Sequence, residues 1–146
     1  MLALVQRVSH ARVTIAGAVV GAIERGLLVF VCAEPADTDA QATKLVDKLL
    51  KLRIFSDEAG KMNRSVQDVQ GGLLIVSQFT LAADTAGGNR PSFSAAAAPP
   101  LGRALYERVL QLARERHAPV AAGEFGADMQ VELINDGPVT IPMRVA

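Results

Sequence analysis

The sequence predicts an α+β fold, in which mixed and largely antiparallel strands form a partly closed barrel with two packed helices. Two observations support this fold class. Segments in which apolar and polar residues alternate occur toward both ends of the chain, and two segments with the period of amphipathic helices lie between them. With 146 residues the chain is long enough to bury a substantial core, so we expect one domain over residues 1–146.

The beginning of the chain has the pattern of an antiparallel meander. Short apolar segments are separated by Gly17, Gly21 and Gly26, which favour turns and bulges. The segments are residues 2–7, 11–15, 18–23 and 26–33. His10 is expected in the first turn between them, facing solvent.

The first helix is predicted within residues 36–52, with Asp37 or Thr38 as its N-cap. Its apolar positions follow the spacing i, i+3, i+4, i+7, i+8, which places them on one face. These positions are Ala42, Leu45, Val46, Leu49 and Leu50. A second helix is expected from Pro100 until Pro119 ends it, with His117 in its last turn.

The middle of the chain contains a predicted strand and a long loop. Residues 73–76 are continuously apolar, as in a central strand covered on both faces. Residues 83–100 are rich in glycine, proline, alanine and small polar residues, and a loop of this length in a compact domain is often functional. After the second helix, residues 129–135 and 139–143 are predicted to be two strands joined at Asp136-Gly137-Pro138.

Composition excludes several classes of protein. The 15 basic and 15 acidic side chains balance, so the long basic tracks of many nucleic-acid-binding proteins are not expected, and any RNA contact should be local. Cys32 is the only cysteine and lies in an apolar run, which indicates a buried thiol and a reducing compartment. Since no apolar run approaches the length of a membrane helix, we expect a cytoplasmic protein.

The common catalytic motifs are missing from the sequence. It has two histidines and no Cys-x-x-Cys, His-Glu-x-x-His, Gly-x-Ser-x-Gly or Walker motif, so no metal site is expected. Two unusual segments remain, residues 77–81 ("SQFTL") and 135–140 ("NDGPVT"). Local patterns alone favour a polar strand end for the first and a plain hairpin turn for the second.

Together, these two segments resemble the two signature motifs of the D-aminoacyl-tRNA deacylases, Ser-Gln-Phe-Thr-Leu and Asn-x-Gly-Pro-Val-Thr. The resemblance extends over nearly the whole chain, through residues 4–15, 61–66, 88–93 and 125–140. It implies the fold of that family and a homodimer whose active sites lie at the subunit interface. It also implies a substrate, namely the ester that joins a D-amino acid or glycine to the terminal adenosine of a tRNA. No cofactor is implied.

The resemblance also assigns roles to individual residues. Gly137 and Pro138 are implied to form a cis pair that reaches into the partner's site and excludes L side chains, and Asn135 and Thr140 are expected to hold this pair. Ser77, Gln78, Phe79 and Thr80 form the implied catalytic segment, in which backbone N–H groups stabilise the oxyanion while Gln78 and Phe79 contact the adenosine.

Three roles stay open at the level of sequence. Thr80 is either a backbone donor or, with a base that the sequence does not reveal, a covalent nucleophile. Arg7 is either a neighbour of the Gly-Pro carbonyls or a surface arginine, and Met129 lines the adenosine pocket or belongs to the core. Two other functions also remain, a non-catalytic dimeric binder of RNA ends and a general esterase with Thr80 or Ser77 as nucleophile.

Overall fold

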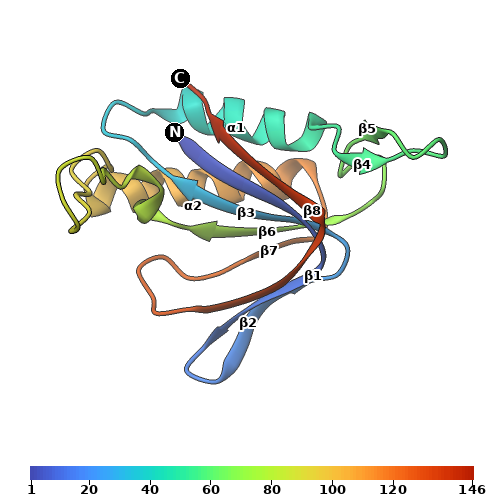
Figure 1. The fold of residues 1–146 in the computed structure, drawn as a ribbon, viewed down its shortest axis with the longest axis horizontal. Coiled ribbons are helices and arrows are strands. Elements are labelled where there is room, and N and C mark those ends of the chain that lie inside the picture. The colour runs from blue at the N-terminus through green and yellow to red at the C-terminus, as the bar shows by residue number, and fades with distance from the viewer.

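The computed structural model describes residues 1–146 and shows two helices lying on one face of a strongly curved sheet (Figure 1). The helices are α1 (Asp39–Lys51) and α2 (Pro99–Arg116), and a 3-10 turn, η1 (Phe79–Ala82), follows β6. The strands are β1 (Leu2–Ile15), β2 (Ala18–Ile23), β3 (Gly26–Cys32), β4 (Phe55–Ser56), β5 (Met62–Arg64), β6 (Gly72–Ser77), β7 (Val120–Ala122) and β8 (Gln130–Arg144).

The main sheet is mixed, with the strand order β2-β1-β3-β6-β7, and β8 pairs with β1. Strand β1 is antiparallel to β2, β3 and β8, whereas β3, β6 and β7 are parallel to one another. The sheet curves until β2 meets β7, where a Cβ atom on Gly21 would lie 2.4 Å from the Ala122 carbonyl oxygen. This close approach of two backbones requires glycine. The predicted α+β class with a partly closed barrel is confirmed.

Helix α1 begins as its sequence predicts. The Thr38 hydroxyl accepts a hydrogen bond from the Ala40 N–H, and the Gln41 side chain accepts one from the Thr38 N–H, which completes a capping box. The five predicted apolar positions are all buried. Helix α2 starts at Pro99, one residue before the predicted start, because proline suits the first turn of a helix.

The core has two parts. The larger lies between the helices and the sheet, where side chains of α1 and α2 pack on β1, β3 and β6. The smaller fills the curve of the sheet and includes Val8, Val13, Leu28 and Leu74. Because β3 and β6 are covered on both faces, their sequences are continuously apolar rather than alternating. Neither helix has the length and apolar composition that a membrane span needs.

The C-terminal segment differs from the prediction. Residues 130–144 form one strand, β8, and both of its halves pair with β1, so the chain does not reverse at Asp136-Gly137-Pro138. His10 also lies within a strand, opposite Ile134, rather than in a turn. Strand β7 and the β4–β5 hairpin were not predicted, because two- and three-residue strands are too short to show a period.

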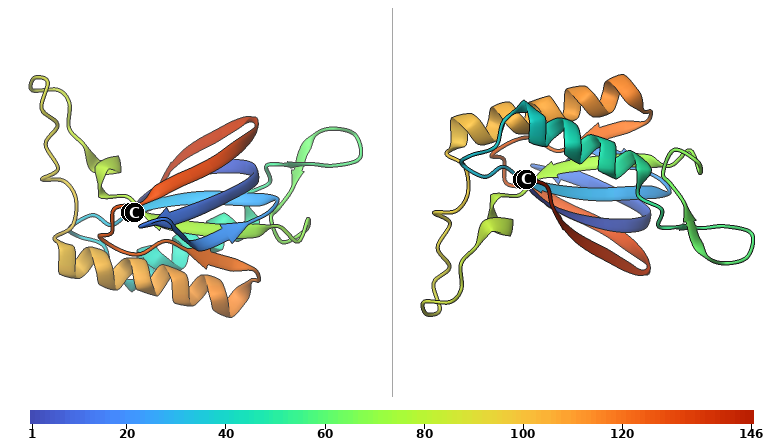
Figure 2. Two further views of the ribbon diagram at one scale, coloured as in Figure 1. Left: turned by 90° about the horizontal axis from the view of Figure 1, so that it is seen from below. Right: turned by 90° about the horizontal axis from the view of Figure 1, so that it is seen from above.

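Two segments extend from opposite ends of the molecule (Figure 2). One is the long connection between η1 and α2, and the other is the region of the β4–β5 hairpin. The first projects beyond the carboxyl ends of β3 and β6, while the hairpin lies near the opposite ends of these strands. The ends of the sheet therefore differ in shape, and each carries one of the two sequence motifs.

Candidate functional site

A cavity of about 660 Å³ lies at the carboxyl ends of β3 and β6. Of its 19 lining residues 14 are hydrophobic, so the cavity suits a ligand with flat apolar faces and few polar groups. The lining comes from the ends of β3 and β6, from within residues 93–98 before α2, from one face of α2 and from within residues 125–131. Five stretches of sequence therefore meet at this cavity.

The first motif forms the rim of this cavity. Ser77 ends β6, and the chain then turns into η1, where no hydrogen bond from the backbone N–H of Phe79 or Thr80 is found within the chain. The first N–H groups of any helical turn lack an internal acceptor, so these donors are free for another one. Ser77, Gln78 and Phe79 line the cavity, and Thr80 is exposed next to them.

The side chains of this rim are arranged in pairs. The Gln78 amide donates to the Thr80 hydroxyl oxygen. Phe79 is 56% exposed, and its ring packs edge-on against Phe93 from the long connection, with 5.1 Å between the ring centres. An exposed aromatic pair at a cavity mouth offers a surface on which a nucleobase can stack.

The wall opposite the rim comes from α2 and the segment before β8. The Tyr106 hydroxyl donates to the Ile75 carbonyl oxygen at 2.7 Å, and burial raises the pKa of Tyr106 to about 12. The Tyr106 ring packs 6.1 Å from Phe125. Met129 also lines the cavity, and its sulfur occupies the space above Gly123, where a Cβ atom would lie only 2.6 Å away.

Cys32 lies at the base of the cavity. Its sulfur lies 3.5 Å from the carbonyl oxygens of Ala33 and Phe79, and its single S–H can donate weakly to either of them. Burial, followed by the nearby charge of Glu34, raises the pKa of this thiol, so the residue stays a neutral packing group. This agrees with the buried thiol that the sequence predicts.

The second motif forms an excursion of β8, residues 136–139, which we call the Gly-Pro excursion. Asn135 pairs with Val8 and Thr140 pairs with Gln6, so these four residues lie opposite Arg7 alone. The Gly137-Pro138 peptide bond is cis, and Gly137 has a φ of +143° that side chains rarely allow. A Cβ atom there would lie 2.7 Å from the Val139 side chain.

Hydrogen bonds hold both ends of the Gly-Pro excursion. The Asn135 side-chain amide donates to the carbonyl oxygens of Arg7 and Val139, at 2.9 Å each. The Thr140 hydroxyl donates to the Asn135 side-chain oxygen at 3.5 Å and accepts from the Gln6 amide at 3.2 Å. Val139 is buried, whereas Gly137 and Pro138 are exposed. The excursion is therefore anchored at its base and open at its tip.

Arg7 lies beneath the Gly-Pro excursion. Its Nε atom donates to the Asp136 carbonyl oxygen at 3.0 Å, and its Nη1 atom donates to the Ile54 carbonyl oxygen at 2.7 Å. The guanidinium group also pairs with the Asp136 carboxylate at 3.4 Å. The side chain is 12% exposed, so it is not a free surface cation.

The two motifs lie far apart within one chain. Arg7, beside the excursion, pairs with Leu27 at the start of β3, whereas Ser77 pairs with Val31 at the end of β3. Four residues along a strand span about 13 Å, and the three strand spacings from β8 to β6 add about 14 Å across the sheet. The Gly-Pro excursion therefore does not contribute to the cavity of its own chain.

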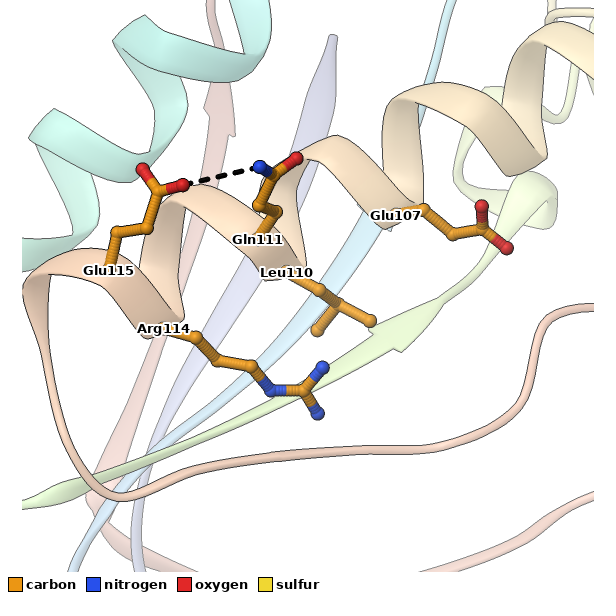
Figure 3. Close-up of a pocket in the computed structure, with 5 residues that line it drawn as sticks. All are labelled: Glu107, Leu110, Gln111, Arg114 and Glu115. Carbon is orange, nitrogen blue, oxygen red and sulfur yellow. Dashed lines mark hydrogen bonds between the residues drawn. The ribbon is translucent and has the colours of Figure 1, made fainter.

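A second, shallower pocket lies on the outer face of α2 (Figure 3). Its residues are Glu107, Leu110, Gln111, Arg114 and Glu115, and the Gln111 amide donates to the Glu115 carboxylate at 3.2 Å. Side chains from a single helix surround it, and neither motif contributes to it. The large cavity is thus the better candidate for the functional site.

The fold and the two motifs define the class of protein. A profile of the D-Tyr-tRNA(Tyr) deacylase family matches residues 4–144. The chain belongs to this family, and the resemblance that its motifs show is confirmed.

Named relatives and solved structures agree with this family. The chain is 70% identical over 145 residues to a D-aminoacyl-tRNA deacylase of Methylibium petroleiphilum, covering 99% of this chain and 95% of that protein. It is 68% identical over 146 residues to a D-aminoacyl-tRNA deacylase of Variovorax paradoxus, covering all of both.

Among solved structures, one titled c-Myc DNA Unwinding Element Binding Protein has 41% sequence identity and a TM-score of 0.94, covering 100% of this chain and 99% of that one. Another, titled as a probable eukaryotic D-amino acid tRNA deacylase, has 18% identity and a TM-score of 0.84, covering 97% of each chain, and shows the shared fold.

Sequence reasoning missed several residues of the cavity. Phe93, Tyr106 and Phe125 all line it, although none stands in either motif. Phe93 lies in the long connection, whose composition predicted a functional loop. Tyr106 and Phe125 have no distinguishing local pattern, because an aromatic residue on an amphipathic helix or in a short loop is ordinary core material.

Proposed function

We propose that the protein is a D-aminoacyl-tRNA deacylase, which hydrolyses the ester between a D-amino acid, or glycine, and the terminal adenosine of a tRNA. The observation that carries the proposal is the pairing of an apolar cavity with free backbone donors at its rim, in a chain that belongs to this family. The cavity is large enough for a nucleoside, and the rim is where the ester carbonyl would lie.

The adenosine is proposed to occupy the cavity. Its base is flat and apolar on both faces, and such bases stack on aromatic side chains independently of sequence. Phe79 and Phe93 offer this surface at the mouth, and Met129 and Tyr106 line the interior. Recognition of the 3′ end alone would let one enzyme act on many tRNAs.

The chemistry is proposed to need backbone donors rather than a side-chain base. An aminoacyl ester is an activated acyl group, and its neighbouring ribose 2′-hydroxyl can position or activate a water molecule. The N–H groups of Phe79 and Thr80 would stabilise the oxyanion, and one such donor is typically worth about 3 kcal/mol.

Thr80 is better suited to this backbone role than to nucleophilic attack. Its hydroxyl oxygen accepts a hydrogen bond from the Gln78 amide, and an amide donor cannot remove a proton. None of the hydrogen bonds of the Thr80 hydroxyl within the chain joins it to a histidine, lysine or carboxylate. These contacts therefore support a general esterase less well than a deacylase that uses backbone donors.

Selection against L substrates is proposed to come from a second copy of the chain. The Gly-Pro excursion is rigidly anchored and exposed at its tip, yet it lies far from the cavity of its own chain. A homodimer that places the excursion of one subunit over the cavity of the other would bring the two motifs together. Gly137 and Pro138 are exposed, and their carbonyl oxygens would then contact the substrate amino group and leave no room for an L side chain.

A matched pair of substrates tests the proposed function. The same tRNA is charged with a D-amino acid or with its L enantiomer, and the loss of ester is followed at equal enzyme concentrations. Hydrolysis of the D ester alone is expected. Absence of turnover would indicate a binding protein, and equal turnover of both enantiomers and of small esters would indicate a general esterase.

A further inference from the structure

The α-ammonium group of Met1 is bound inside the protein. It donates hydrogen bonds to the carboxylates of Glu34 and Asp37, at 2.9 Å and 3.0 Å, and to the Val145 carbonyl oxygen at 2.9 Å. Met1 is 1% exposed and the Asp37 side chain is 7% exposed. All three N–H donors of the ammonium group are therefore used, at a place that water hardly reaches.

Four charges balance at this place. The Arg144 guanidinium donates to the Glu34 carboxylate through Nε at 3.1 Å and Nη2 at 3.3 Å. These bonds, followed by the bond from the Met1 ammonium group, lower the pKa of Glu34. Removal of the ammonium charge would leave two carboxylates against one guanidinium group, and breaking a buried ion pair from one side is strongly destabilising.

The charge cluster is joined to the wall of the large cavity. Glu34 follows Ala33, whose carbonyl oxygen accepts from the Ala97 N–H at 2.9 Å, and both alanines line the cavity. Asp37 fixes the same turn, because its carboxylate accepts from the Glu34 N–H at 2.7 Å. The Met1 ammonium group thus holds the turn between β3 and α1, and this turn holds the segment that leads into α2.

We propose that, in a chain that begins at an unmodified Met1, the α-ammonium group is a positioning group for the cavity, so that acylation of this amine, by a formyl or an acetyl group, or its extension by further residues weakens substrate binding. An acyl amide has one N–H donor and no charge, in place of three donors and a positive charge. The link to substrate binding rests on the proposed function of the cavity, whereas the link to the cavity wall does not.

Six proteins, in three pairs with and without an N-terminal extension, test the proposal. The chain is released from a fusion by a protease that cuts directly before Met1, and it is compared with the chain that keeps a Gly-Ser extension there. Each form is also made with Glu34→Gln. Three readings are taken: the melting temperature, the ¹³C-methyl signals of Ala33 and Ala97, and KM for a D-aminoacyl-tRNA.

The extension is expected to lower the melting temperature of the otherwise unchanged chain by about 6 °C or more. The extension should also shift the methyl signals of Ala33 and Ala97, whereas the methyl signal of Ala127, on the loop before β8, should not move. It should raise KM several-fold with little change in kcat. In the Glu34→Gln background the same extension should do much less, because coupled groups are not additive. Cleavage that restores Met1 as the first residue should reverse all three changes.

Glu132→Gln is the matched control, since Glu132 pairs with Arg12 on the exposed face of β1 and β8. In the Glu132→Gln variant the extension should have the same effect as in the unchanged chain. Equal melting temperatures and methyl signals with and without the extension, or additive effects of the extension and Glu34→Gln, would overturn the proposal. If the extension and Glu34→Gln have non-additive effects on the melting temperature and the methyl signals, but no D-aminoacyl-tRNA is hydrolysed, the positioning role stands and the proposed function is refuted.

Discussion

The side-chain amide of Asn135 donates to the carbonyl oxygen of Val139 across a distance of 2.9 Å, and so closes the base of the Gly-Pro excursion. The same amide also donates to the Arg7 carbonyl oxygen on the neighbouring strand. One side chain thus replaces the strand pairing that β8 loses over four residues. This relationship explains how an exposed tip can be held in a fixed position, as the proposed selector role requires.

Replacement of Asn135 by Ala is expected to loosen the Gly-Pro excursion. Two backbone carbonyl oxygens would lose their donor, which typically costs about 1–3 kcal/mol of folding free energy. Discrimination between D- and L-aminoacyl-tRNA should fall, because exclusion of an L side chain depends on a fixed position of the tip. Urea unfolding and the ratio of kcat/KM for the two enantiomers measure the two effects. Unchanged discrimination in the folded variant would argue against the selector role.

Arg7→Lys is expected to have the effect of removing Arg7, although lysine keeps the positive charge. The guanidinium group donates to the carbonyl oxygens of Asp136 and Ile54 in different directions, and an ammonium group on a thinner stem does not reproduce this fork. A loss of about 1–2 kcal/mol of stability is expected. Reduced D/L discrimination should accompany it, as measured with the paired substrates. Arg12→Lys, an exposed arginine on the same strand, serves as the control and should change neither property.

Thr80→Ala is expected to keep substantial deacylase activity. The proposed oxyanion donors are backbone N–H groups, which survive the substitution, whereas the hydroxyl serves mainly as an acceptor for Gln78. Single-turnover hydrolysis of a D-aminoacyl-tRNA measures the effect on the chemical step. A complete loss of hydrolysis by a folded variant would instead make the Thr80 hydroxyl a participant in the reaction.

The raised pKa of Tyr106 predicts a loss of stability at high pH. Burial raises its pKa from 10.0 to about 12, so the unfolded chain releases this proton before the folded chain does as pH rises. Stability should therefore be unaffected by Tyr106 below about pH 10 and should decrease between about pH 10 and 12, by roughly 2–3 kcal/mol. Urea unfolding across this range should show a smaller decrease for Tyr106→Phe than for the unchanged chain. Parallel curves would contradict the assignment.

Much of the fold follows from local patterns. The five apolar positions of α1 predicted its buried face, and its N-cap was one of the two residues that the sequence offered. In contrast, the sequence did not reveal that β8 continues through Asp136-Gly137-Pro138. Turn residues usually reverse a chain, and only the pairing of both halves with β1 shows that this one does not.

The sequence predicted the two motifs of the candidate site but not where they lie in the fold. In the structure Ser77, Gln78 and Phe79 line the cavity, and Thr80 is exposed beside them. The aromatic lining from Phe93, Tyr106 and Phe125 comes from segments that meet only in the folded chain. The separation of the two motifs also depends on strand order, since β3 and β6 are parallel and adjacent although about 40 residues separate them. No local pattern contains that information.

The central claim is that the Gly-Pro excursion of one subunit completes the cavity of another. The most direct test mixes equal amounts of two variants, Gly137→Ala in the excursion and Ala127→Trp in the cavity, and measures hydrolysis of D- and L-aminoacyl-tRNA by the re-formed dimers. Gly137→Ala alone should hydrolyse both enantiomers, and Ala127→Trp alone should hydrolyse neither. Random pairing of subunits places an intact excursion over half of the open cavities, so hydrolysis of the L ester per Gly137→Ala subunit should fall by about half while hydrolysis of the D ester persists. Unchanged hydrolysis of the L ester, although mixed dimers form, would contradict the account.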